Sequence, residues 1–280
     1  MMRQKSYDNS PSLYLIPTPV GNMEDITLRA VNILKMVDVI LCEDTRVTSE
    51  LLSKLEIKKK LIHCDDHNED VVKEKALEFL KEGLNIGLVT DRGTPIISDP
   101  GYRVVEYLSS LGFNVISLPG ATAFVPALTA SGINPSSFLF YGFLSNKESK
   151  RVKELESLKN LKFTIIFYEA PHRITDMLKS LLDVFGDRRI ALCREISKKY
   201  EEIIRGKISE VLEISDMIKG EMVVVVEGNL KDEDYSEISI LEHINIYLED
   251  GMSEKDAIKK VAVERKIPKS VVYKEYHIKK

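Results

Sequence analysis

The stretch NIGLVTDRGTPIISDPGYRVV, residues 85–105, indicates the fold of this chain more clearly than any other. It begins with a short apolar run, which is typical of a buried strand. A helical pattern at 72–83 precedes this run and ends at Gly83. A second helical pattern at 102–112 leads into another apolar run at 113–120. Helices that alternate with strands in this way predict a largely parallel α/β sheet.

The same alternation continues on both sides of this stretch. Before it, we predict strands at 13–16 and 38–44 and helices at 25–37 and 48–57, with Asp25 as the N-cap of the first helix. After it, a second series contains strands at 138–143, 163–171, 189–196 and 220–228 and helices at 147–160 and 173–186. We therefore predict α/β domains at 12–118 and 119–229. An acidic linker and a helix–turn–helix-like tail, 236–280, follow, with the turn at Ile267-Pro268.

Composition excludes several classes of protein. The 280 residues are 44% hydrophobic and 30% charged, which favours a packed core over disorder. The net charge of −4 argues against a uniformly basic nucleic-acid binder. The charge is uneven, however: residues 231–250 are acidic and residues 251–280 are basic, so the tail is a candidate for phosphate contact.

Cysteine usage and hydropathy bear on the compartment. Three scattered cysteines, with no CxxC pair, indicate reduced thiols rather than a disulfide framework or a zinc site. The polar N-terminus is not followed by the apolar segment of a secretory leader. No apolar run approaches the ~18 residues that span a membrane. We therefore expect a cytoplasmic protein that binds no metal through its own side chains.

Three loops are unusual in composition, at 17–22, 90–101 and 118–123. Each follows a predicted strand and combines Pro or Gly with small residues, which allows the backbone to approach a ligand closely. Ligands of parallel sheets bind where loops leave the carboxyl ends of the strands. The dinucleotide pattern GxGxxG and the phosphate-binding pattern GxxxxGK[ST] are both absent. The loops therefore predict a binding cleft without naming its ligand.

Seven motifs occur in an order and at spacings that resemble one known family. They are LYLIPTPVGNMEDITLRA, CEDTR, DHNE, GTPIISDPGY, LPGATA, IFYEAPHR and EMVVVVEG. The chain resembles the ribosomal small-subunit methyltransferase I family, which belongs to the tetrapyrrole-methylase-like methyltransferases. The resemblance implies a two-domain α/β fold with S-adenosyl-L-methionine bound in the interdomain cleft. It also implies a homodimer that methylates the 2′-hydroxyl of a cytidine in the decoding region of 16S rRNA in the small ribosomal subunit.

The resemblance also implies which residues bind the methyl donor. They are Pro19, Val20, Gly21, Asp91, Gly93, Thr94, Ile97, Thr122, Ala123 and Tyr168. Turn-forming residues gather in two clusters, 91–95 and 98–101. The first cluster is then the donor-binding turn, and the second starts the next helix and holds the shape of that turn. One departure is Arg92, which stands where the family usually has a small residue in S-D-A-G-T-P. Either its side chain points outward or the donor pocket is altered, and we favour the outward orientation.

A ribose hydroxyl is a weak nucleophile and gains from a positioned base. Our candidates for the catalytic groups are Asp44, His67 and Glu169, without an assignment of the proton acceptor. Two simpler readings stay open: Asp44 could form an ion pair with Arg46, and His67 could cap the helix that follows it. For RNA binding we expect cationic side chains to contact phosphates, namely Arg46, Lys147, Lys150, Arg151, His172 and Arg173.

Two other functions remain possible. An enzyme of the same fold could methylate a tetrapyrrole such as a siroheme or corrin precursor, although its first loop would be expected to resemble GxGPGD rather than PTPVGN. A non-catalytic RNA-binding paralogue is the second possibility, and only Arg92 favours it. Donor binding separates the enzyme from the paralogue.

Overall fold

The computed structural model describes residues 3–6, 8–230, 235 and 238–278. Residues 1–228 form one compact unit, called here the first unit, and residues 229–280 form the second. The first unit contains two five-stranded sheets, one in each half of its sequence.

The first sheet is parallel, as the alternation of helices and strands predicts. Its strands are β1 (Ser12–Leu15), β2 (Val39–Cys42), β3 (Lys60–His63), β4 (Ile86–Val89) and β5 (Asn114–Ser117). They lie in the order β3-β2-β4-β1-β5, and every pair is parallel. The sequence reading missed β3, because this edge strand is half-exposed and carries polar residues at both ends.

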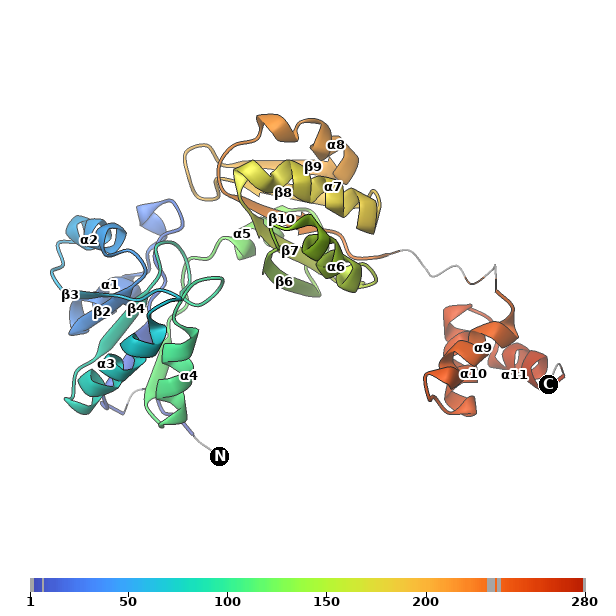
Figure 1. The fold of residues 1–280 in the computed structure, drawn as a ribbon, viewed down its shortest axis with the longest axis horizontal. Helices are drawn as coiled ribbons and strands as arrows, with labels where there is room; N and C mark the ends of the chain where they lie inside the picture. Colours follow the sequence, from blue (N-terminus) through green and yellow to red (C-terminus); the bar gives the residue numbers. More distant parts are fainter. Residues whose placement is uncertain (1–2, 7, 231–234, 236–237, 279–280) are drawn as a thin grey trace. The chain divides into compact units, whose positions relative to one another are not determined.

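Helices cover both faces of this sheet (Figure 1). They are α1 (Leu28–Met36), α2 (Thr45–Lys54), α3 (Glu69–Lys81) and α4 (Tyr102–Ser110). Leu77 of α3 and Leu108 of α4 pack with Leu88 on one face. Leu34 of α1 and Leu52 of α2 pack with Ile40 on the other. Burial on both faces explains why the central strands are continuously apolar instead of alternating.

The first helix begins later than predicted. Residues Met23–Asp25 form a separate 3-10 turn, and Thr27 rather than Asp25 caps α1, accepting a hydrogen bond from the Ala30 N–H at 3.0 Å. Ile26 adopts an extended conformation between the two segments. Asp25 instead accepts a hydrogen bond from the Ser197 hydroxyl in the other half of the unit.

The second sheet is not the parallel continuation that the sequence predicts. Its strands, in the order β6-β7-β10-β8-β9, are β6 (Phe138–Phe143), β7 (Thr164–Glu169), β8 (Arg189–Arg194), β9 (Glu202–Lys207) and β10 (Met222–Val226). Only β6 and β7 pair in parallel. The β10 strand runs antiparallel to both β7 and β8, and β8 to β9. A hairpin between β8 and β9 needs no crossover helix, so the α/β alternation breaks there.

Helices α6 (Glu148–Leu158), α7 (Ile174–Phe185) and α8 (Ile208–Glu213) pack on one face of the second sheet. Helix α5 (Phe124–Ala130), which follows the third unusual loop, packs on the other face through Ala127 and Leu128.

The described residues of the second unit form a bundle of three helices, α9 (Ile240–Glu249), α10 (Glu254–Glu264) and α11 (Lys269–Ile278). Its core contains Ile244, Ile258, Val261 and Val272. The predicted helix, turn and helix are therefore present. The acidic segment is helical from Ile240, whereas most of the predicted linker lies outside the described residues. No helix in the described part of the chain is long and apolar enough to cross a membrane.

Candidate functional site

The three unusual loops meet because of the strand order. Strand β1 lies between β4 and β5, so the loops that follow these strands are neighbours. Thr18 and Gly93 exchange main-chain hydrogen bonds of 2.8 and 3.0 Å, which join the first loop to the second. The Thr94 hydroxyl donates to the Ala121 carbonyl at 2.9 Å, which joins the second loop to the third.

Glycine is required at two points of this junction. Gly93 has a φ of +88°, a backbone region that side-chain-bearing residues rarely adopt. Gly120 lies against Pro17 so closely that an added Cβ would stand 2.6 Å from the proline Cβ. The loops can therefore approach each other without side chains between them.

The second turn cluster has a separate task, as predicted: it starts α4. Gly101 caps the helix with a φ of +119°. Its N–H donates to the Glu69 carboxylate, which also accepts from the Arg103 N–H at 3.1 Å. Ser98, at the start of this cluster, has a positive φ of 65°, and so does Ile96, just before it, at 77°. Such values are rare for a β-branched residue and mark a strained segment.

A cavity of about 300 Å³ opens where the three loops face the second sheet. Seven of the ten predicted donor-binding residues line it: Val20, Gly93, Thr94, Ile97, Thr122, Ala123 and Tyr168. Pro19, Gly21 and Asp91 do not, although they lie in the loops that do. The cavity has the size and mixed lining of a small-molecule site.

The sequence reading missed other residues of the lining, among them Asp99, Phe143, Lys198, Glu221, Met222 and Val223. Asp99 is the only acidic residue of the motif GTPIISDPGY, and this feature could have identified it as a candidate. No sequence motif marks Lys198 or Glu221 as a cavity residue. Lys198 precedes β9 and Glu221 precedes β10, so only the folding of the second sheet brings them to the same cavity.

Arg92 lies at the edge of the cavity and is bound by the other half of the unit. Its guanidinium forms an ion pair with Glu221, and its side chain is 51% exposed. Glu221 also pairs with Lys198 at 2.8 Å, and Lys198 with Glu195 at 2.9 Å. Arg92 is therefore neutralised by a neighbouring carboxylate and does not direct an uncompensated charge into the cavity.

Comparison with known proteins assigns the chain to a family. The family model for tetrapyrrole (corrin/porphyrin) methylases matches residues 12–212. The ribosomal RNA small subunit methyltransferase I of Bacillus subtilis is 47% identical, over 100% of this chain and 99% of its own. The chain belongs to the ribosomal RNA small subunit methyltransferase I family. The protein of the same name from Halalkalibacterium halodurans is 42% identical over 99% of both chains.

Solved structures share the fold of this family. The methyltransferase CobJ superposes with a TM-score of 0.61 at 20% identity, over 79% of this chain and 95% of its own. Uroporphyrin-III-C-methyltransferase from Thermus thermophilus gives 0.57 at 19% identity, over 77% and 94%. At this level of identity the likeness concerns the fold alone. The predicted tetrapyrrole-methylase fold is confirmed.

Acidic side chains lie at one side of the cavity in this family member. Burial, together with the nearby carboxylates of Glu43 and Asp91, raises the pKa of Asp99 to about 6. Burial also raises the pKa of Glu43 and of Asp91. The Thr90 hydroxyl donates to Glu43 at 3.2 Å, and Asp91 accepts from the Asp44 N–H at 3.1 Å. Of these carboxylates, Asp99 is the one that lines the cavity.

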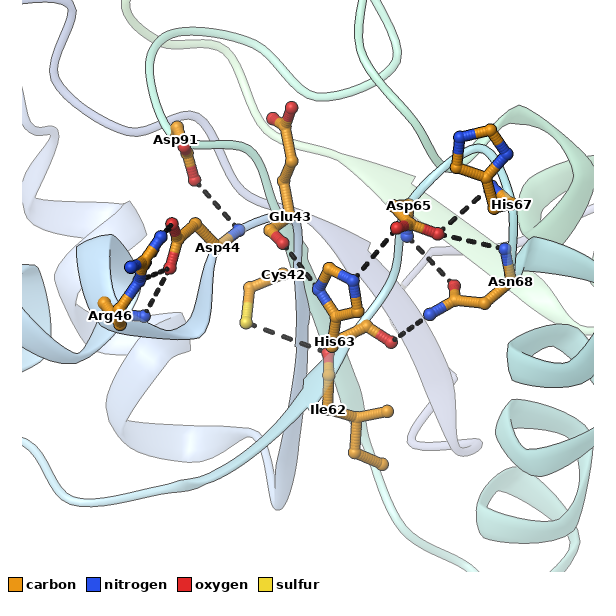
Figure 2. A network of polar contacts seen from close by, with 10 residues as sticks. All are labelled: Cys42, Glu43, Asp44, Arg46, Ile62, His63, Asp65, His67, Asn68 and Asp91. Atoms are coloured by element: carbon orange, nitrogen blue, oxygen red, sulfur yellow. Dashed lines mark hydrogen bonds and ion pairs between the residues drawn. The ribbon is translucent and has the colours of Figure 1, made fainter.

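Asp44, a predicted catalytic residue, does not line the cavity. Its carboxylate caps α2, accepting from the Arg46 N–H at 2.8 Å, and pairs with the Arg46 guanidinium at 2.6 Å (Figure 2). These bonds to Arg46 lower the pKa of Asp44. The structure therefore shows the ion pair that the sequence left open. This pair engages both Asp44, the catalytic candidate, and Arg46, the expected RNA-binding residue.

His67 is exposed and also lies away from the cavity lining. It follows β3, which is the edge strand two places away from β4. Figure 2 shows that Asp65 accepts from the main-chain N–H groups of His67 and Asn68 at the start of α3, both at 3.0 Å. Asp65 thus holds the turn that leads into α3, and the N-cap of the helix is Asn68 rather than His67. The imidazole that takes part in these contacts is that of His63. Its Nδ1 lies 2.7 Å from the Glu43 carbonyl oxygen and its Nε2 lies 3.0 Å from the Asp65 carboxylate.

Glu169 lies beside the cavity, but its side chain has no exposed surface. Its carboxylate accepts from the Ala170 N–H at 2.8 Å and pairs with Arg173 at 3.0 Å. Burial raises its pKa, and both partners oppose that shift. These contacts favour a role in fixing the turn after β7.

The other expected RNA-binding residues separate into two groups. Lys147, Lys150 and His172 are exposed, and Arg173 is half-buried. Arg151 is only 5% exposed, and its Nε donates to Ser180 at 2.9 Å. Arg151 therefore packs α6 against α7 and is not available to a phosphate.

Proposed function

We propose that this chain transfers the methyl group of S-adenosyl-L-methionine to the 2′-hydroxyl of a cytidine in the decoding region of 16S rRNA. Its family membership supports methyl transfer, and the names of its relatives support the small-subunit RNA as substrate. The observation that carries the proposal is the junction of three loops around one cavity, lined by seven residues that the family resemblance implies. Action on ribosomal RNA further implies a cytoplasmic protein, and we propose a homodimer.

The lining is compatible with the donor. Gly93 and Ala123 line the cavity without large side chains, which leaves room for a ligand of this size. Asp99 supplies negative charge at the cavity, whereas the charge of Glu221 is compensated by Arg92 and Lys198. When bound, the donor would supply an electrophilic methyl carbon on a cationic sulfur, and the Asp99 carboxylate would provide the opposite charge at the cavity. The protein's main contribution is to hold the acceptor hydroxyl in line with that carbon.

Asp99 is the best-placed proton acceptor. It lines the cavity, whereas Asp44 and His67 do not, and Glu169 is enclosed by Ala170 and Arg173. A pKa of about 6 leaves Asp99 largely ionised at neutral pH yet more basic than an ordinary carboxylate. We propose that it accepts the proton of the ribose hydroxyl.

Basic side chains at the ends of β6 and β7 are proposed to hold the RNA backbone. Lys147 and Lys150 belong to the start of α6, and His172 and Arg173 follow β7. Side chains of this kind position RNA through its phosphates without reading its sequence.

The test is methyl transfer from isotopically labelled donor to small ribosomal subunits, followed by nucleoside analysis of the 16S rRNA. The expected product is 2′-O-methylcytidine, formed by the wild-type protein and lost in Asp99→Asn. Asp187→Asn is the matched control, because Asp187 lies outside the cavity lining and bonds Ser209. Label on a base would refute the 2′-hydroxyl as acceptor. In a parallel reaction with a tetrapyrrole as acceptor, label on the tetrapyrrole and none on RNA would favour the porphyrin-methylating alternative. In a separate calorimetric titration, failure to bind the donor would favour the non-catalytic one.

A further inference from the structure

The edge strand β6 contains an irregularity that redirects its last side chain. Its pairing with β7 shifts register between Phe140 and Gly142. Gly142 has a φ of +83°, and a Cβ added to it would lie 3.0 Å from the Ser98 hydroxyl oxygen. Backbone torsion and packing therefore both select glycine here. An insertion of this kind is a β-bulge, which bends a strand and changes the direction of the side chains that follow.

The bulge places two phenylalanines, three positions apart, on the same face of the sheet. In a regular strand Phe140 and Phe143 would point to opposite faces. Instead both contact Tyr168, with ring centroids 5.0 Å away for Phe140 and 5.6 Å for Phe143. Tyr141, between them, packs on Phe167 in the core of the other face, with ring centroids 5.7 Å apart. Phe143 is thus brought to the cavity by the bulge.

The Phe143 ring packs against Tyr168 and leaves about half of its surface exposed. Its ring meets Tyr168 edge to face at 62°. It lines the cavity and is 52% exposed. Splayed RNA bases are commonly held by stacking on aromatic side chains, and a half-exposed ring that packs on Tyr168 at the edge of a ligand cavity provides such a surface.

Basic side chains follow the same two strands and indicate which molecule brings the base. Lys147 is exposed four residues beyond Phe143, and His172 is exposed just beyond β7. The Arg173 guanidinium donates to the Leu144 carbonyl at 2.6 Å, so the turn after β7 is attached to the residue next to Phe143. Cations beside an open aromatic ring suit a nucleotide within a phosphate backbone.

We propose that a base of the RNA substrate stacks on Phe143 when its nucleotide enters the cavity. This inference rests on the proposed RNA methylation and adds a positioning residue to it. The adenine of the methyl donor is a nucleobase too. Donor binding and RNA methylation must therefore be measured separately.

The experiment compares the full-length Phe143→Ala and Phe143→Leu proteins with wild type. Donor affinity is measured by calorimetry, and methyl transfer to small ribosomal subunits as kcat and KM. Loss of a base–aromatic stack should lower kcat/KM for the subunits by roughly 5- to 150-fold, chiefly through KM, while donor affinity stays within about twofold. Phe143→Leu should fail like alanine, since it keeps an apolar side chain without an aromatic face, and Phe143→Tyr should restore activity.

Phe163→Ala is the matched control, because Phe163 is 49% exposed in the same half of the unit and does not line the cavity. If the wild-type protein methylates the RNA and Phe143→Ala does so equally well, this inference is overturned and the proposed function stands. Equal weakening of donor binding and methylation would assign the ring to the donor adenine and would also overturn it. Absence of RNA methylation by the wild-type protein would overturn the proposed function and this inference with it.

Discussion

Replacing Asp99 by asparagine should stabilise the first unit at neutral pH while it abolishes methyl transfer. Burial, together with Glu43 and Asp91, raises the pKa of Asp99 from an ordinary 3.8 to about 6. A carboxyl with a raised pKa binds its proton more tightly in the folded protein than in the unfolded chain. The folded state is therefore destabilised progressively as the pH rises from the unfolded pKa through the folded one, and the full penalty applies above about pH 6.

The size of the penalty follows from the two pKa values. At about 1.4 kcal/mol per pH unit, the difference between 3.8 and about 6 corresponds to at most about 3 kcal/mol. Asp99 is only partly buried, so solvent screening reduces this to roughly 1–2 kcal/mol. For a unit of this size, about 2–4 °C per kcal/mol predicts a rise in Tm of roughly 2–8 °C.

The assay is thermal unfolding, followed by circular dichroism, of wild type and Asp99→Asn between about pH 4 and pH 8. The gain in Tm should be largest at the alkaline end and should vanish near the acidic end. Asp187→Asn is the matched control with the opposite sign. Hydrogen bonds from Ser209 lower the pKa of Asp187, so its stabilisation is present at neutral pH and lost on acidification. An Asp99→Asn protein that gains nothing at neutral pH, or gains equally at every pH, would refute the reasoning.

Three further predictions concern the cavity. If ionised Asp99 accepts the proton, wild-type kcat/KM should fall about tenfold per pH unit below about pH 6; a flat profile down to about pH 5 would contradict this. Arg92→Ala should change donor affinity, measured by calorimetry, by no more than about threefold, because Lys198 continues to neutralise Glu221; a large gain in affinity would mean that the arginine blocks the cavity. Gly93→Ala should destabilise the first unit by about 1–2 kcal/mol in denaturant titration, because its φ of +88° is unfavourable for alanine. An unchanged midpoint would show that the loop relaxes without strain.

Local patterns in the sequence predicted most elements of the first sheet, and the exceptions have identifiable causes. Buried strands such as β4 gave continuous apolar runs, because helices cover both of their faces. Strand β3 was missed because an edge strand needs no such run. The second sheet was predicted with the wrong strand directions, because the antiparallel position of β10 depends on pairing with β7 and β8 rather than on any residue inside it.

The candidate site was predictable where it consists of loops and unpredictable where it consists of long-range partners. Gly93 and Thr94 stood in a recognisable motif, and both line the cavity. Lys198 and Glu221 gave no signal, since their role depends on the approach of Arg92 from the other half of the unit. Asp44 and His67 have suitable chemistry in the sequence, yet they lie outside the lining because their loops follow β2 and β3, toward one edge of the sheet.

The sequence by itself determined the family, the three small-residue loops and the alternation that builds a parallel sheet, because each depends on the identity and spacing of nearby residues. The tertiary structure alone decided which side chains share the cavity. Strand order brings three separate loops together, and a single bulge at Gly142 brings Phe143 to the face of Tyr168. Burial among other carboxylates makes Asp99 a stronger base than its residue type implies. Such properties arise from contacts between residues far apart in the chain, and no local pattern contains them.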